Sequence, residues 1–229
     1  MKVVIFGGGS GVGLAAAKLL AARGDEVIIA GRGVEPIEGF RTYAVDGKDQ
    51  AAVAALFEQI GMIDHLVITA GATNRGGAFL TEITDATFRA TFEGKFWVQV
   101  TAAHLGARYV KPGGSITLFS GGANRRALKG MVNVAAVNGA LDAIVPTLAI
   151  ELAPTRVNSI SPGTLRTTYW TGTPDAQLDA IMANVAAHLP AGRAGTAEDI
   201  ARAVEFVIDS PFMTGTTLCV DGGLPHSTL

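Results

Sequence analysis

Residues 3–13, VVIFGGGSGVG, decide the fold that this sequence predicts. An apolar, β-branched run passes directly into glycines at positions 7, 11 and 13, and a stretch of helical period follows. Such a strand-to-helix turn is tight, lets the backbone approach a pyrophosphate and turns the N–H groups of the helix N-terminus toward the anion. The pattern predicts a dinucleotide-binding turn, although a glycine cluster on its own also fits an ordinary tight turn.

Strand-like and helix-like segments alternate along the rest of the chain. Strands are predicted at 3–6, 26–30, 41–45, 65–69, 115–119, 156–160 and 217–220, and helices at 11–23, 49–60, 83–108, 132–152, 175–188 and 196–208. Residues 31–40 carry Pro36 and three glycines in place of an apolar helical stripe, so this crossover is predicted as a loop. The alternation predicts one α/β domain over residues 1–229, with a Rossmann-like, doubly wound, parallel seven-stranded sheet and helices on both faces.

Composition narrows the classes of partner. The chain is 48% hydrophobic, enough for a substantial core, and its formal net charge is -2. No run of Lys or Arg suggests a nucleic-acid groove, and the N-terminus lacks the apolar length of a signal peptide or membrane span. The single cysteine, Cys219, forms no intramolecular disulfide, and no Cys/His cluster suggests a metal. We expect a cytoplasmic protein that binds a small molecule, without nucleic acid, membrane or metal.

The end of the second predicted strand bears on the choice of nucleotide. An acidic side chain at this point binds a ribose 2′-hydroxyl, whereas an arginine accommodates a 2′-phosphate. Here the strand ends in Gly31-Arg32, with no carboxylate at the position. We therefore predict NADP(H) in preference to NAD(H); the alternative is an ordinary solvated arginine.

Further motifs, in chain order, resemble one known family. They are AVDGKD at 44–49, Ala70-Gly71 after the fourth predicted strand, SPGTLRT at 161–167, and the stretch from GRAGTAEDI to VDGG at 192–223. With the GxxxGxG turn, they make the chain similar to the short-chain dehydrogenases/reductases of the small, single-domain type, from its first residues to about residue 223. Thr69 departs from this family, which has Asn at that position.

The resemblance implies a set of cofactor-binding residues. Asp46 would hydrogen-bond the adenine, and Thr167 would hydrogen-bond the nicotinamide carboxamide. The full implied set is Gly7, Gly9, Ser10, Gly11, Val12, Gly13, Arg32, Asp46, Ala70, Gly71, Pro162, Gly163, Thr164, Leu165 and Thr167. The resemblance also implies a homodimer or homotetramer built through the helices at 83–108 and 132–152.

The family's catalytic positions hold unusual residues in this chain. Aligning NVAAVNGALDAIV with the family's YxxxK helix puts Val134 at the tyrosine and Asn138 at the lysine. The serine position falls on Gly121, or on Ser120 after a shift of one residue, and the asparagine position falls on Thr91. Hydride arriving at a carbonyl carbon leaves an alkoxide that needs a proton, which valine cannot supply. Ordinary ketone reduction by the family mechanism is therefore disfavoured.

Other side chains are candidates to replace the missing donor, and each has a structural alternative. Ser120 is one, and Tyr169 lies in a region that resembles the family's lid, where an aromatic residue also serves simply as a cover. Arg125, Arg126 and Lys129 fit either an acidic substrate or a solvated loop. His104 lies in the long helix that the resemblance implies at a subunit interface, so packing there is expected and not catalysis, and His188 is expected to lie at a helix end.

Two classes of function stay open. One is an NADPH-dependent oxidoreductase with a non-standard site, acting on an iminium ion, a quinone or an activated alkene. The other is a catalytically inactive nucleotide-binding or redox-sensing protein. The element PGTLRT, at the nicotinamide end, favours the enzyme, since a pure nucleotide sensor needs it less.

Overall fold

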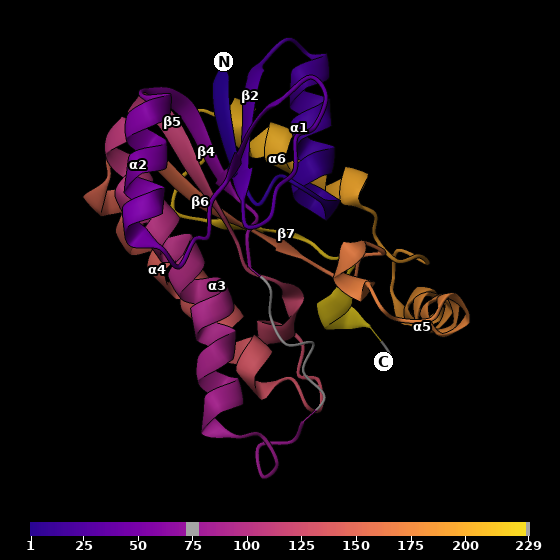
Figure 1. Ribbon diagram of the computed structural model, residues 1–229. Helices are drawn as coiled ribbons and strands as arrows, with labels where there is room; N and C mark the ends of the chain where they lie inside the picture. The colour runs from indigo at the N-terminus through magenta and orange to yellow at the C-terminus, as the bar shows by residue number, and fades with distance from the viewer. Residues whose placement is uncertain (72–77, 228–229) are drawn as a thin grey trace.

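Seven parallel strands form one sheet in a computed structural model that describes residues 1–71 and 78–227 (Figure 1). The strand order is β3-β2-β1-β4-β5-β6-β7, and every neighbouring pair is parallel. The strands are β1 (Lys2–Phe6), β2 (Glu26–Gly31), β3 (Arg41–Ala44), β4 (Ile63–Ile68), β5 (Val110–Phe119), β6 (Arg156–Pro162) and β7 (Thr217–Val220). This is the Rossmann-like α/β fold that the sequence predicts.

Helices cover both faces of the sheet (Figure 1). They are α1 (Gly11–Ala22), α2 (Gln50–Ile60), α3 (Asp85–Gly106), α4 (Val132–Glu151), α5 (Asp175–His188) and α6 (Ala197–Asp209). Alternate residues of a strand point to opposite faces. Val4 and Phe6 of β1 accordingly join the core under α2, α3 and α4, while Val3 and Ile5 join the core under α1 and α6. Figure 1 shows α5 apart from both layers, beyond the lower end of the sheet.

Most predicted boundaries lie within two residues of the observed ones. The largest difference is β5, which begins at Val110 and not at residue 115, because the Pro and Gly residues at 112–114 hide the strand pattern. The helix predicted at 83–108 ends at Gly106 and continues as a 3₁₀ turn, Ala107–Tyr109. Between β2 and β3 no helix occurs, as predicted from Pro36 and the glycines around it.

The length and hydropathy of α4 would be enough to cross a membrane. In the structure α4 contacts β6 and α3, and its side chains Val137, Leu141 and Val145 are fully buried. An apolar helix of this kind is what a sheet covered on both faces requires.

The sheet order also locates a ligand site. From β1 the chain builds outward to β2 and β3, then returns to the other side of β1 with β4. In open α/β sheets, ligands bind at the carboxyl ends of the strands where the order reverses in this way. The turn after β1 and the segment after β4 therefore border the expected crevice.

A capping box starts α6, the helix that packs most closely on α1. The Thr196 hydroxyl accepts a hydrogen bond from Asp199 N at 3.3 Å, and the Asp199 carboxylate accepts one from Thr196 N at 2.9 Å. We expect Thr196→Ala to lower the free energy of unfolding by about 1 kcal/mol, a usual cost for a lost N-cap. Urea unfolding measures the change, and Thr196→Ser, which keeps the hydroxyl, is the control. Equal stability of the alanine variant and the wild type would contradict the capping role.

Candidate active site

The glycine turn after β1 is held against β4 with almost no free space. Gly7 has φ +104°, and a Cβ there would lie 2.4 Å from Ala70 N; a Cβ on Gly13 would lie 2.3 Å from Gly7 O. The Thr69 hydroxyl donates to Gly7 O at 3.0 Å. Thr69, which stands where the family has Asn, thus ties the turn to the end of β4.

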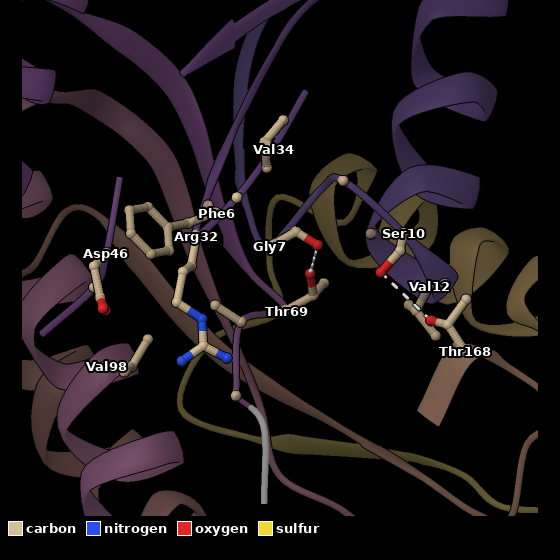
Figure 2. A pocket seen from close by; sticks show the side chains of 18 of the residues that line it. Phe6, Gly7, Ser10, Val12, Arg32, Val34, Asp46, Thr69, Val98 and Thr168 are labelled. Atoms are coloured by element: carbon tan, nitrogen blue, oxygen red, sulfur yellow. Dashed lines mark hydrogen bonds between the residues drawn. The ribbon is translucent and has the colours of Figure 1, made fainter. Parts of the chain in front are cut away.

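A cleft of about 890 Å³ opens at this turn, at the carboxyl ends of β1, β2 and β4 (Figure 2). The predicted cofactor residues on its walls are Gly7, Gly9, Ser10, Gly11, Val12, Gly13, Arg32, Asp46, Ala70, Gly71 and Thr167. Four other predicted residues, Pro162, Gly163, Thr164 and Leu165, lie at the end of β6 and after it and do not line this cleft. The structure thus gathers predicted residues from five separate parts of the chain around one space.

The N-terminus of α1 faces the cleft. Ser10 occupies the N-cap position but makes no side-chain hydrogen bond to the helix, so the first turn of α1 keeps N–H groups that can bind an anion. Thr168 donates to Ser10 Oγ at 3.4 Å, as Figure 2 shows. The 3₁₀ turn Thr168–Trp170 therefore reaches across to the glycine turn and covers one side of the cleft.

Charged side chains mark the end of the cleft beside β2 and β3. Arg32 is exposed and extends into the cleft, and Asp46 lies on the neighbouring wall (Figure 2). Sequence reasoning missed two further charged residues on these walls, Glu35 and Lys48. Lys48 lies two residues after Asp46, whose carboxylate accepts a hydrogen bond from the Lys48 backbone N–H at 3.0 Å. Its place in the AVDGKD motif could therefore have indicated that Lys48 lies beside the cleft.

The residues that the sequence analysis aligns with the family's catalytic positions lie close together, on α3, on α4 and after β5. A Cβ on Gly121 would lie 3.1 Å from Asn138 Nδ2, so these two positions are neighbours. Val134 is buried, and Thr91 accepts a hydrogen bond from Asn133 Nδ2 at 2.8 Å. These four positions, Thr91, Gly121, Val134 and Asn138, offer no group that releases a proton near neutral pH.

The side chains considered as alternative proton donors lie in different surroundings. Ser120 is buried, and its hydroxyl accepts a weak hydrogen bond from Ser159 at 3.4 Å inside the sheet. Tyr169 lines the cleft and is 41% exposed. Arg125 pairs with Asp142 at 3.3 Å, which accounts for its charge without a substrate.

The remaining candidates have other surroundings. Lys129 lines a second hollow, beside Leu80 and Met131. Arg126 lies outside the helices and strands, two residues after the 3₁₀ turn Gly122–Asn124. His104 is an exposed residue of the last turn of α3, while His188 ends α5, as predicted, with Nδ1 at 2.7 Å from Asn184 O. Among the residues that the structure describes, no three His, Cys, Asp or Glu side chains are grouped as a metal site requires.

Lys95 is the residue of this region that sequence reasoning missed. It lies on α3, and its Nζ donates to Ser120 O at 2.7 Å and to Asn138 Oδ1 at 2.6 Å. Burial lowers the pKa of its ammonium to about 8, and the nearby Asp142 carboxylate only partly offsets the effect. A cation thus contacts Asn138, the residue that the sequence analysis aligns with the family's lysine.

Comparison with known proteins identifies the family. Residues 7–225 match the family described as enoyl-(acyl carrier protein) reductase. The chain is also 30% identical to the short-chain dehydrogenase/reductase ATR9 of Stachybotrys chlorohalonatus, over 97% of this chain and 96% of that protein. The chain belongs to the short-chain dehydrogenase/reductase family. The short-chain reductase protein NovJ of Streptomyces niveus is 33% identical to it, over 97% of this chain and 93% of that protein.

The fold of this short-chain dehydrogenase/reductase is shared with solved structures. One, a small-chain dehydrogenase in complex with NADPH, is 40% identical, with a TM-score of 0.90 and 98% of each chain covered. A second small-chain dehydrogenase is 35% identical, with a TM-score of 0.81 and the same coverage. The family resemblance that the motifs indicate is thereby confirmed.

Proposed function

We propose that this oxidoreductase uses NADP(H) and transfers hydride between that cofactor and a small molecule. The observation that carries the proposal is the glycine turn at the mouth of the cleft with Arg32, and no carboxylate, at the end of β2. A 40% identical structure that holds NADPH supports it. Bound NADPH would supply the hydride.

The residues of the cleft fit this cofactor. Gly7 and Gly13 leave the backbone of the turn bare, because a Cβ on either would overlap atoms of the protein. The N-terminus of α1 suits the pyrophosphate, and the guanidinium of Arg32, aided by the ammonium of Lys48, suits a 2′-phosphate. The Asp46 carboxylate would accept from the adenine amine, and Thr167 would hold the nicotinamide end.

Replacing Arg32 tests the choice of nucleotide. We expect Arg32→Ala to weaken NADPH binding roughly 10- to 100-fold, because a hydrogen bond to a charged group contributes about 1.5–3 kcal/mol. NADH binding should change little. Fluorescence titration with each nucleotide measures both affinities, and Arg202→Ala, at an exposed position of α6, is the matched control. Equal affinity of wild type for the two nucleotides, unchanged in Arg32→Ala, would contradict the preference.

The second candidate function is nucleotide sensing without chemistry. Val134 and Gly121, at the positions of the family's tyrosine and serine, favour it because neither can donate a side-chain proton. The two functions make opposite predictions. An oxidoreductase oxidises bound NADPH when a suitable acceptor is added, whereas a sensor binds NADPH with no turnover and changes its affinity for a partner.

A further inference from the structure

Lys95, on α3, contacts both the end of the sheet after β5 and the helix α4 through its side-chain nitrogen. Its two acceptors are the backbone oxygen of Ser120, directly after β5, and the side-chain oxygen of Asn138 on α4. Asn138 occupies the position of the family's lysine. The ammonium that the family places on α4 is therefore replaced here by one that comes from α3 and is bound to the residue at the same position.

Two glycines make room for this pair. Gly71 lines the cofactor cleft, and a Cβ there would lie only 2.8 Å from Lys95 Cγ. Lys95 thus lies directly behind a wall of the cleft that has no side chain. On the other side, a Cβ on Gly121 would lie 3.1 Å from Asn138 Nδ2. The glycine at the family's serine position leaves space for Asn138, so the unusual residues fit one another.

The α3 helix also borders the cleft next to Lys95. Ala90, Gly94 and Val98, which share one face of the helix, line the cleft. Lys95 follows Gly94 and turns from that face toward α4. Lys95 is therefore the sequence neighbour of a residue in the cleft wall, Gly94, and its side chain donates a hydrogen bond to Asn138 on α4.

Among residues 1–71 and 78–227, few charges act on the ammonium. Asp142, one helical turn beyond Asn138, is the carboxylate that raises its pKa, and Asp142 is itself paired with Arg125. On α3, Arg89 and Glu93 line a separate hollow with Trp97. The ends of β4 and β5, at 68–71 and 118–122, contain no charged side chain.

We propose that Lys95 is the proton donor of this oxidoreductase and protonates the oxygen of a ketone or aldehyde as hydride reaches the carbonyl carbon. The inference rests on the proposed NADP(H)-dependent hydride transfer. It provides the acid that Val134 and Asn138 lack, and it makes carbonyl compounds the substrate class. Asn138 is a positioning residue, because it holds the ammonium through its side-chain oxygen.

The step balances with groups already named. The carbonyl carbon gains a C–H bond with two electrons from the reduced cofactor, which becomes NADP⁺, and the C=O π pair moves to oxygen. That oxygen forms an O–H bond with a proton from Lys95 Nζ, whose N–H bond breaks to leave a neutral amine. A solvent proton then restores the ammonium. Catalysis by a general acid of this kind needs a pKa near the working pH, as burial gives Lys95.

The test uses two acceptors that differ in their need for a proton. Ethyl acetoacetate is a ketone that must be protonated on oxygen, while N-methyl-dihydroisoquinolinium is an iminium ion that gives a neutral amine on hydride transfer alone. We expect Lys95→Met to lower kcat/KM for the ketone by about 100-fold or more. Iminium reduction and NADPH affinity should stay within threefold of wild type. Lys18→Met, at an exposed position of α1, is the control.

Each outcome decides between the proposals. If wild type reduces the ketone and Lys95→Met reduces it equally well, the role of Lys95 is overturned and hydride transfer stands. If wild type reduces the iminium ion but not the ketone, the role of Lys95 is likewise overturned and hydride transfer stands. If wild type binds NADPH and reduces neither acceptor, hydride transfer is overturned, and the role of Lys95 with it.

An NMR titration of protein labelled at lysine Cε provides a readout without turnover. We expect one lysine signal to titrate near pH 8 and to be absent from Lys95→Met. Asn138→Asp puts a carboxylate beside the ammonium and should raise that midpoint by about one unit or more. The midpoint of the pH profile for ketone reduction should move with it. If Asn138→Asp shifts the NMR midpoint but leaves the pH profile for ketone reduction unchanged, Lys95 is not the proton donor.

Discussion

Alanine at Gly13 is expected to remove measurable NADPH binding and to destabilise the fold. A Cβ at this position would lie 2.3 Å from Gly7 O, 2.6 Å from Thr69 Oγ1 and 2.9 Å from Gly7 C. Two of these atoms belong to the backbone of the glycine turn, which cannot move aside as the end of a flexible side chain can. The helix N-terminus must therefore shift away from β1. Overpacking of this kind costs about 1–3 kcal/mol.

The loss of binding follows from the same shift. The N–H groups that would hold the pyrophosphate lie on the turn and on the first residues of α1. Losing two hydrogen bonds to a charged group, at about 1.5–3 kcal/mol each, weakens binding by about 100-fold or more. Isothermal titration calorimetry with NADPH measures the affinity, and urea unfolding measures the stability.

Gly139→Ala is the matched control for this substitution. Gly139 lies inside α4, where the nearest atom to a new Cβ is Asn124 Cβ at 3.9 Å, an ordinary contact. Alanine there should stabilise the helix by up to about 1 kcal/mol and leave NADPH affinity unchanged. If Gly13→Ala bound NADPH as wild type does, the close packing of the turn against β4 would have no part in cofactor binding.

The fold was predictable because its signals are local. The central strands β1, β2 and β4 are apolar runs that are almost wholly buried, and each crossover contains a helical stripe, except at 31–40, where Pro36 and the glycines interrupt it. The glycine turn was predictable for a related reason, since only glycine fits a position such as Gly7, where φ is positive and a Cβ has no space. Local sequence determines such features directly.

Lys95 could not be found in this way, because its surroundings come from distant parts of the chain. Its acceptors, Ser120 and Asn138, lie 25 and 43 positions away. A search for a proton donor at the family's fixed spacing reaches Val134 and Asn138 and stops there. One signal was present, a lysine between Gly94 and the apolar run that begins at Phe96, where a charge is unexpected on a helix that covers a sheet.

Acidification is expected to destabilise the fold through His65. This residue of β4 is 5% exposed, and its Nδ1 lies 2.8 Å from Ser115 Oγ. Burial, with the positive charge of Arg156 as a smaller contribution, lowers the pKa of His65 from 6.5 to about 4. The unfolded chain therefore binds a proton at a higher pH than the folded chain does. The stabilising contribution of neutral His65 is complete above about pH 6.5 and declines as the pH falls toward 4.

The size of this effect follows from the two pKa values. Their difference corresponds to about 3 kcal/mol in full, of which about 2 kcal/mol is lost between pH 7.5 and pH 5. Urea unfolding at these two pH values measures the loss in wild type. His65→Gln keeps a polar side chain of similar size that does not titrate, so its free energy of unfolding should change by about 2 kcal/mol less over the same interval. Carboxylates such as Asp64, with a pKa below 3.8, respond only at lower pH, so a parallel decline of both proteins would show that His65 is not the group responsible.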